Sequence, residues 1–534
     1  MLLLACAGAA QRATASENLL ADADIPFAMP EMRRPAFPDR EYPITDHGAV
    51  GDGERLNTTA IQAAINACSQ AGGGFVRVPA GRWLTGPIEL KSGVNLHLHR
   101  DAVLVFTTDK RHYFGTAAAS AGNQWAQHSL SPAELEESVQ SQPLISAFDC
   151  DNIAITGEGT IDGQGSGWWP LHKRWWERFK SQIPGSEAME AIAWAGLDRE
   201  GSPQRPRMIQ PIKCRNVLLE GFTALNGPFW MINPVGCENV IMRKLTVRAA
   251  LEGPHTDTPN TDGINPESCR NVLVEDCTID TGDDSIAIKS GRDEMGRQRG
   301  MPAENIVIRR VRAKRIAIGS EMSGGVRNIL IRDCALGGEN TLFHLKTRRG
   351  RGGVVENIWF ENITGSSFSE AAIKVDMEYW THVEPAPPEP VSERTPRIRN
   401  LVFSNVRSEG GTGSAIAVRL NGLPEAPLEN VVLKDLRITA PNGIFCNEAT
   451  RVRFENVNVQ VRQQPAVTVS NSRDVAFTRL ALGGVARPVI DVAGGATRDV
   501  RFDDTVEPFR VAFVLKDGAS AEHVRFPDGA EASQ

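Results

Sequence analysis

Eleven short segments repeat along the chain and share one pattern, an Asn or similar residue followed by alternating apolar and polar residues. Most neighbouring copies begin 22 to 34 residues apart. Alternation with a period of two is typical of a half-buried strand. Strands this short cannot bury an apolar face alone, whereas stacked copies form a continuous core. The copies are CDNIAITG from Cys150, CRNVLLEG from Cys214, CENVIMRK from Cys237, CRNVLVED from Cys269, AENIVIRR from Ala303, VRNILIRD from Val326, VENIWFEN from Val355, IRNLVFSN from Ile398, LENVVLKD from Leu428, TRVRFEN from Thr450 and SRDVAFT from Ser472.

The repeat predicts an all-β fold, a parallel β-helix or solenoid. Two other repeat architectures fit less well. A leucine-rich horseshoe needs an L-x-x-L-x-L pattern in every copy, which is absent. A propeller needs four strands per blade and a period of roughly 40 residues, whereas most copies here begin 22 to 34 residues apart.

A solenoid needs a cap over the exposed end of its core. In the stretch LNTTAIQAAINACSQAGGG, Ile61, Ala64, Ile65 and Cys68 follow helical spacing. The polar residues 57–59 suit the start of a helix, and Gly72 suits its end. We therefore expect an N-terminal capping helix.

The chain divides into a short leader and one long domain. Residues 1–15 end in Ala13-Thr14-Ala15 and resemble the remnant of a secretory signal, although a positive n-region is missing. A lipid anchor at Cys6 and a disordered cytoplasmic leader are the alternatives. We expect a linker over 16–40, a single β-helix catalytic domain over 41–534, and a secreted or periplasmic location.

A Trp-rich insertion at about 168–209 interrupts the repeat and holds five of the ten tryptophans. Exposed aromatic side chains bind sugar faces, but packing against the solenoid is equally compatible with this composition. The insertion therefore predicts either a cleft wall or a packed flap.

Composition excludes several classes of protein. No apolar run reaches the 18 residues that a membrane span needs. A formal charge of -7 argues against general nucleic-acid binding, which depends on clustered Lys and Arg. Nine cysteines without a C-x-x-C pair indicate neither a disulfide scaffold nor a metal site. We expect no cofactor and no bound metal, and the sequence leaves the oligomeric state unknown.

Three aspartates stand out from the turns around them. Asp283 and Asp284 follow Asp262 by 21 and 22 residues, close to one coil of the solenoid. Because adjacent parallel strands lie about 4.8 Å apart, one coil of separation predicts neighbours in space. Adjacent residues of a regular strand point to opposite faces, so Asp283 and Asp284 share a face only if TGDDS bends at Gly282.

Clustered carboxylates repel one another, so at least one is expected to have a raised pKa and to keep its proton at mildly acidic pH. A protonated carboxyl beside ionised partners is the arrangement that inverting glycosidases use. Capped turns along the solenoid and a calcium site are the alternatives for the same residues.

The motifs NTDG, GDDS, GSEMSGG and HLK, in this order and within such coils, resemble glycoside hydrolase family 28, the polygalacturonase family of pectin-degrading enzymes. HGAVGDGERLNTTAIQAAINAC, GTIDGQGSGWW and CRNVLLEGFTALNGPFWMINPVGCENV look like its bacterial branch. The resemblance covers roughly residues 42–379 and implies a right-handed parallel β-helix that hydrolyses a galacturonate-containing chain with inversion.

The resemblance also implies roles for individual residues. Asp283 matches the general acid, while Asp262 and Asp284 match the pair that activates water. Lys346 matches the lysine of the Arg-Ile-Lys motif, which binds a substrate carboxylate, and Tyr379 matches a substrate-contacting tyrosine. The further substrate-binding candidates are Asn260 in NTDG and the cations Lys289 and Arg292.

Two positions depart from the family pattern. The family's Gly-His-Gly histidine, which supports the catalytic aspartate, has no counterpart between Ala313 and Glu321. His344 replaces the arginine of Arg-Ile-Lys, and imidazole cannot reproduce the planar fork of a guanidinium. His344 either substitutes functionally or is a structural residue.

Basic residues in KTRRGRGG, together with Lys289 and Arg292, indicate either a solvated loop or a basic rim that suits a polyanionic sugar. The resemblance implies a pectin hydrolase, and the likeness of GSEMSGG to bacterial exo-acting members implies that it is exo-acting. A rhamnogalacturonan or substituted-galacturonan hydrolase, a pectate-type lyase and a non-catalytic sugar-binding β-helix are the alternatives.

Overall fold

The computed structural model describes residues 17–113, 142–170, 205–250, 258–379, 387–504, 511–527 and 532–533. The leader with Cys6 and most of the Trp-rich insertion lie outside these residues, so the predictions made for them stay untested. Trp168 and Trp169 at the start of the insertion are buried. Trp168 meets Tyr113 edge to face at 5.2 Å, and Trp169 Nε1 donates to the Gly227 carbonyl at 3.0 Å. These two tryptophans pack in the core.

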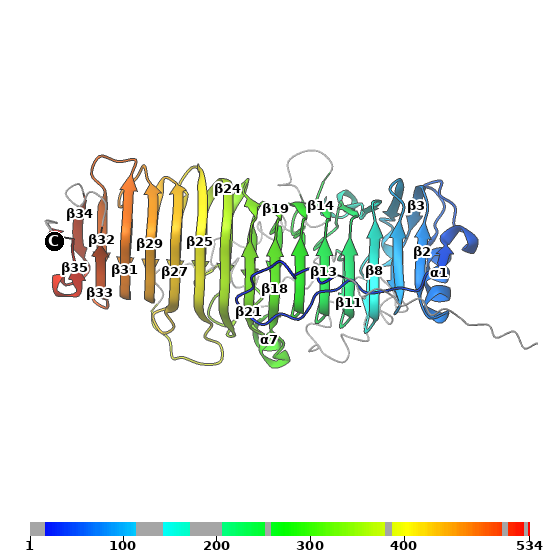
Figure 1. The fold of residues 1–534 in the computed structure, drawn as a ribbon, viewed down its shortest axis with the longest axis horizontal. Coiled ribbons are helices and arrows are strands. Elements are labelled where there is room, and N and C mark those ends of the chain that lie inside the picture. Colours follow the sequence, from blue (N-terminus) through cyan, green and yellow to red (C-terminus); the bar gives the residue numbers. More distant parts are fainter. Residues whose placement is uncertain are drawn as a thin grey trace, which may run out of the picture.

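The chain winds into an elongated parallel β-helix, with α1 (Thr58–Gln70) at one end and the C-terminal strands at the other (Figure 1). Its strands stack in three rows, and strands of successive coils pair in parallel within each row. The helix is right-handed, as in the solved relatives described below. The predicted fold class and the N-terminal helix are therefore confirmed.

The first row contains all eleven repeats as strands. Successive members pair in order, so that Val217 aligns with Ile153 on one side and with Val240 on the other. The row comprises β1 (Glu41–Pro43), β2 (Gly74–Val78), β5 (Val94–Leu98), β8 (Asp151–Gly157), β11 (Arg215–Glu220), β13 (Glu238–Arg243), β15 (Arg270–Glu275), β18 (Ala303–Arg309), β21 (Val326–Arg332), the start of β24 (Val354–Asp376), β25 (Arg397–Gly411), β27 (Leu428–Thr439), β29 (Ala449–Gln460), β31 (Arg473–Gly483), β33 (Arg498–Asp503) and β35 (Val524–Arg525).

The second row is made of short strands, and the third row carries the candidate site. The second comprises β3 (Gly81–Thr85), β6 (Ala102–Phe106), β9 (Thr160–Asp162), β12 (Thr223–Leu225), β14 (Thr246–Arg248), β16 (Thr278–Asp280), β19 (Arg312–Ala313) and β22 (Ala335–Leu336). The third comprises β4 (Ile88–Leu90), β7 (Ile145–Phe148), β10 (Ile209–Ile212), β17 (Ile286–Ile288), β20 (Ile316–Gly319), β23 (Glu339–Lys346), the end of β24, β26 (Ile416–Asn421), β28 (Asn442–Asn447), β30 (Val467–Ser470), β32 (Val489–Ala493), β34 (Ala512–Lys516) and β36 (Ala532–Ser533). A second helix, α7 (Asp293–Arg299), follows β17.

The recurrent asparagine of the repeat has a specific structural task. Asn216, Asn239 and Asn271 each adopt a left-handed conformation with φ of 56°, which asparagine tolerates better than most residues. The amide of Asn239 donates to Asn216 at 3.1 Å, and that of Asn271 donates to Asn239 at 3.1 Å. The ladder continues in both directions through Asn152, Asn305, Asn328, Asn357, Asn400 and Asn430. It therefore holds the corners of successive coils in register.

The inward side chains form one continuous core along the solenoid. Phe454, Phe477 and Phe502 stack in three successive coils, with ring centroids 4.4 and 4.8 Å apart. The eight cysteines among the described residues are buried as free thiols, including Cys269 and Cys277 at either end of β15. The cysteines of the repeats are therefore core residues.

Helix α1 packs Ile61, Ala64, Ile65 and Cys68 into the core, as the spacing predicts. Its start differs in detail, because the Asn57 amide bonds the Val50 and Leu84 backbone and not the helix. No helix among the described residues is long and apolar enough to cross a membrane.

The segment expected to be a linker lies along the outside of the first row, where it crosses several strands (Figure 1). We call residues 18–37 the strap. Its buried Leu20 and Met32 cover an outward apolar stripe on successive strands, which comprises Ala154, Leu218, Ile241, Leu273, Val307 and Leu330. Phe27 packs against Trp359 at 5.8 Å, and Phe37 against Phe75 at 6.1 Å. The strap is thus packed against the solenoid.

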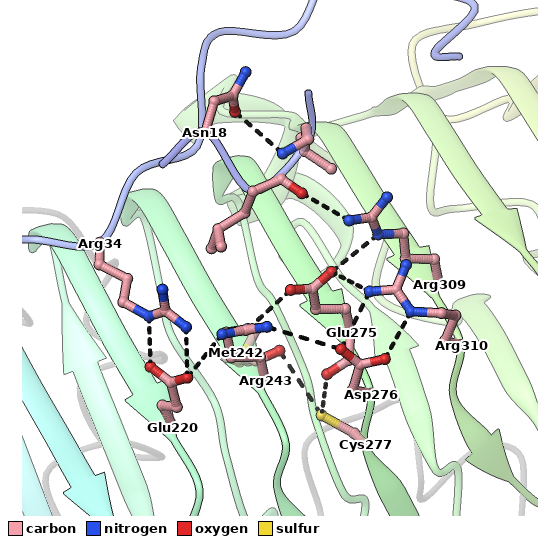
Figure 2. Close-up of polar contacts among 12 residues, drawn as sticks. Asn18, Arg34, Glu220, Met242, Arg243, Glu275, Asp276, Cys277, Arg309 and Arg310 are labelled. Carbon is pink, nitrogen blue, oxygen red and sulfur yellow. Dashed lines mark hydrogen bonds and ion pairs between the residues drawn. The ribbon is translucent and has the colours of Figure 1, made fainter. Parts of the chain in front are cut away.

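A buried ion network lies beside the strap (Figure 2). Glu275 is 1% exposed and accepts hydrogen bonds from Arg243 at 2.8 Å, Arg309 at 2.9 Å and Arg310 at 2.7 Å. Arg309 also donates to the Leu19 carbonyl of the strap at 2.7 Å. Glu275 therefore links three coils and helps to position the arginine that holds the strap.

We expect Glu275→Ala to destabilise the protein by about 3–5 kcal/mol, because removing one partner leaves buried charges uncompensated. The free energy of unfolding from urea titration measures the effect. The matched control is Glu429→Ala in the exposed Glu429–Arg451 pair, where we expect about 0–1 kcal/mol. Equal losses in the two variants would contradict the role given to the buried network.

Candidate active site

The three aspartates lie on adjacent coils of the third row, as their spacing predicts. Ile264 pairs with Ile286 in parallel, so the same register brings Asp262 level with Asp284. The Gly263 N–H donates to the Asp284 carbonyl at 3.0 Å. An interval of 22 residues in the sequence is therefore a single step between neighbouring strands.

The segment TGDDS bends before β17, which lets both aspartates join one cluster. Gly282 N–H donates to Thr261 Oγ1 at 3.1 Å, which ties this bend to the coil of Asp262. The side chain of Asp283 is 31% exposed, whereas those of Asp284 and Asp262 are 2% and 5% exposed. Of the three, Asp283 is the carboxyl that a substrate reaches most easily.

Asp284 is held by a cation at each carboxylate oxygen. Arg315 Nε bonds Oδ1, and Lys346 Nζ donates to Oδ2 at 2.8 Å. Burial alone would raise the pKa of Asp284, but the charges of Lys346, Arg315 and Lys289 outweigh burial and hold it well below its usual range. Asp284 is therefore an ionised carboxylate across the neutral and mildly acidic range.

Asp262 has the opposite electrostatic environment. Burial, together with the negative charges of Asp283 and Asp284, raises its pKa to about 7, although Lys289 opposes the shift at 3.6 Å. Asn265 Nδ2 donates to Oδ2 at 3.1 Å. The cluster thus contains a carboxyl that keeps a proton below about pH 7, as expected for like charges gathered in one place.

Lys289 belongs to the wall of this cluster. Its ammonium donates to Glu321 at 3.1 Å and lies 4.5 Å from the centre of the Trp230 ring. Burial would lower the pKa of Lys289, but Glu321, Asp262 and Asp284 raise it overall. Lys289 is therefore a fixed cation beside Asp262.

Lys346, His344 and Tyr379 come together next to the aspartates. The Lys346 ammonium lies 5.4 Å from the Tyr379 ring, and the His344 and Tyr379 rings meet edge to face at 5.7 Å. Burial and the charges of Lys346 and Lys374 hold the pKa of His344 well below its usual range. His344 Nε2 is buried and forms no hydrogen bond to the described residues. A neutral imidazole with an unused polar atom thus lies beside the fixed ammonium.

Asn260 and Arg292 lie at the edges of the site. Asn260 Oδ1 accepts from Arg205 at 2.8 Å, and Arg205 stacks over Phe229 at 4.9 Å. Burial lowers the pKa of Arg205 to about 9 against the opposing charges of Asp262 and Asp283. Arg292 lies 3.4 Å from Asp293. Burial would raise the pKa of Glu321, but the charges of Lys289, Arg351 and Arg292 lower it overall.

The basic loop after Lys346 does not form a simple rim. Arg349 pairs with Glu425 through two bonds of 2.6 and 2.7 Å. Arg351 is fully buried, donates to the Ser320 carbonyl at 2.8 Å and pairs with Asp293. These two arginines therefore hold the loop in place, and Arg315, Lys346 and Lys289 contact the aspartates, with Arg205 acting on Asp262 and Asp283 through its charge.

Sequence reasoning missed Arg315, Arg205 and Glu321. Arg315 lies within AKRIAIGSE, just before the GSEMSGG motif and in the stretch that lacks the family's histidine. A cation one coil after GDDS was the signal that could have revealed it. No comparable signal marks Arg205, because only the folded coils bring it to Asn260.

Two buried aspartates and a partly exposed third, with cations from neighbouring coils beside them, lie together on a parallel β-helix. The sequence model described as "Glycosyl hydrolases family 28" matches residues 68–461. The chain belongs to this family and is a glycoside hydrolase.

Individual relatives agree with this assignment. A Vitis vinifera protein named "Probable polygalacturonase" is 32% identical over 74% of this chain and 73% of its own length. The "Exo-poly-alpha-D-galacturonosidase" of Dickeya chrysanthemi is 26% identical over 78% of this chain and 70% of its own length. The crystal structure of a hyperthermoactive exopolygalacturonase from Thermotoga maritima has a TM-score of 0.64 and 32% identity, and covers 85% of this chain and 94% of that one.

The raised pKa of Asp262 predicts that removing its charge stabilises the fold at alkaline pH. Its folded pKa of about 7 lies above the usual value, so the stability from its protonated form is full below the unfolded pKa and is lost as pH rises through about 7. We expect Asp262→Asn to have a higher Tm than the unsubstituted protein at about pH 8, with a smaller gain at about pH 5. Calorimetry at both values measures this.

The control is Asp101→Asn, because the Asp101 side chain is exposed. This variant should show no such dependence on pH. An Asp262→Asn gain that is equal at the two pH values would contradict the assigned ionisation.

Proposed function

We propose that the protein is a polygalacturonase that hydrolyses a galacturonate-containing pectic chain with inversion and acts from a chain end. One observation carries the proposal. A protonatable, an ionised and an exposed carboxyl lie together, and a fixed ammonium, a neutral imidazole and a tyrosine adjoin them. The names of the relatives support the substrate class.

Asp283 is the proposed general acid. It is the most exposed carboxyl of the three, so it is the one that can approach a glycosidic oxygen. Among the described residues its Oδ2 accepts no hydrogen bond, while Oδ1 accepts from Arg315 and from the Asp284 N–H. Asp262, whose pKa is raised to about 7, holds a proton below that pH and passes it to Asp283 in the proposed mechanism. Delivery through Asp283 lets the leaving sugar depart as an alcohol.

Asp284 and Asp262 are the proposed pair that activates water. Asp284 is ionised and accepts a proton as the water attacks the anomeric carbon from the opposite side of the sugar. Asp262, one strand away, binds the same water. Inversion follows because a single displacement takes place without a covalent intermediate.

Substrate recognition is assigned to the side chains around the three aspartates. The ammonium of Lys346 suits a uronate carboxylate, and the neutral imidazole of His344 beside it is the second candidate group. Tyr379 contacts both of these side chains, while Asn260, Lys289 and Arg292 are the remaining candidates for substrate contact. The replacement of an arginine by His344 makes a substituted galacturonan the second candidate substrate.

Hydrolysis is favoured over calcium-dependent elimination by the charge balance. Arg315 and Lys346 occupy the Asp284 oxygens that a calcium ion would need, and Lys289 adjoins Asp262. A passive sugar-binding β-helix would have no need for a carboxyl with a pKa raised to about 7. The proposed polymeric substrate fits the predicted export from the cytoplasm.

We expect Asp283→Asn to lower kcat by about 10²–10⁴-fold, the usual contribution of a general acid. Binding should persist because the asparagine side chain has the same shape as that of aspartate. Kinetics on polygalacturonate and calorimetric binding of a galacturonate oligomer measure the two effects. Unchanged turnover would refute the acid role, and Asp101→Asn serves as an active control.

Digestion of polygalacturonate tests the reaction and its direction. We expect new reducing ends without ultraviolet absorbance, activity that survives a chelator, and small products from the earliest times. NMR of the first product should show the inverted anomer. An absorbing product would indicate elimination, and an early ladder of mid-sized oligomers would refute action from a chain end.

A further inference from the structure

Arg315 links the two adjacent aspartates from the next coil. It immediately precedes β20, and β20 pairs with β17 so that Ile316 aligns with Ile286. The Ile286 N–H also donates to the Arg315 carbonyl at 3.3 Å. The position of this backbone is therefore set by the register of the coils.

The guanidinium contacts both carboxylates at once. Nη2 donates to Asp283 Oδ1 at 2.7 Å, and Nε bonds Asp284 Oδ1. Arginine suits this task because its donors form a rigid planar fork, whereas an ammonium is a single point of charge. The side chain of Arg315 is only 12% exposed, so water weakens these contacts little.

We propose that Arg315 is a positioning residue of the active site, which fixes the orientation of Asp283 and keeps Asp284 charged by bridging the two carboxylates. The proposal rests on the proposed function of these aspartates. By occupying Asp283 Oδ1, the guanidinium leaves Oδ2 as the oxygen for the glycosidic bond. By bonding Asp284 Oδ1, it complements Lys346 on the other oxygen.

The other charged groups that face the cluster do not duplicate this bridge. Lys346 bonds Asp284, while Lys289 adjoins Asp262 and Glu321. Arg205 influences Asp262 and Asp283 through its charge but bonds Asn260. His344 is a neutral neighbour, because burial and nearby cations lower its pKa.

A permanent guanidinium has a consequence that a histidine at this place would not have. An imidazole loses its charge near about pH 6.5, within the range where the aspartate cluster itself titrates. Arginine stays charged throughout that range. The positive charge that holds Asp283 and Asp284 together is therefore independent of pH in that range.

Two variants separate charge from geometry. Arg315→Gln removes the cation, so the pKa of Asp284 should rise and the acidic limb of the kcat profile should move to higher pH. We expect kcat to fall by about 10²-fold, as for a misplaced catalytic group, with KM nearly unchanged. Arg315→Lys keeps the charge, so its acidic limb should stay near that of the unsubstituted protein while kcat still falls.

Lys314→Gln is the matched control. Lys314 precedes Arg315, but its ammonium bonds the Thr281 carbonyl at 2.8 Å and lies 3.3 Å from Asp280. Its variant should keep the kcat and pH profile of the unsubstituted protein. The proposal is overturned if Arg315→Gln has the same kcat and the same acidic limb of the pH profile as Lys314→Gln. It is also overturned if Arg315→Gln loses only thermal stability and its acidic limb does not move.

A readout without catalysis separates this proposal from the proposed function. The ¹³C carboxyl signal of Asp284, assigned by its absence in Asp284→Asn, is followed against pH in the full-length protein. We expect it to titrate at higher pH in Arg315→Gln than in the unsubstituted chain. If no polyuronate is hydrolysed but this shift occurs, the proposed function fails and the bridge stands. Without the shift, the bridge fails whatever the activity.

Discussion

Parallel hydrogen bonding between successive coils, kept in register by the asparagine ladder, is the constraint on which the rest of the structure depends. Asn216, Asn239 and Asn271 occupy equivalent left-handed corners and bond one another. Each corner fixes where the following strand begins, so residues at equivalent places on successive coils stack. The same periodic spacing that builds the core also stacks the residues of the active site.

The same stacking balances the charges of the site. Three carboxylates on two coils would repel one another, and the following coils supply Arg315 and Lys346 as counterions. Unequal neutralisation then gives the carboxyls different ionisation. Asp284 stays ionised between two cations, whereas the buried Asp262 has a pKa raised to about 7. Asp283 is the most exposed of the three carboxyls.

The sequence predicted the fold well because the repeat has a simple physical basis. Alternating apolar residues and a left-handed Asn corner are local features, and all eleven copies form strands of one row. The meeting of Asp262 with Asp284 followed from the coil length. The strap could not be predicted in this way, because the apolar stripe under Leu20 and Met32 is assembled from side chains on separate coils.

The sequence by itself determined the parallel β-helix, the capping helix and the nearness of the three aspartates, since each depends on spacing along the chain. Only the tertiary structure decided the partners of those aspartates and their ionisation. A pKa depends on burial and on every charge nearby, and these charges come from other coils; Lys346, for example, lies 62 residues from Asp284 in the sequence. For the same reason Arg349 and Arg351 proved to be structural ties, while Arg315 proved to contact the aspartates directly.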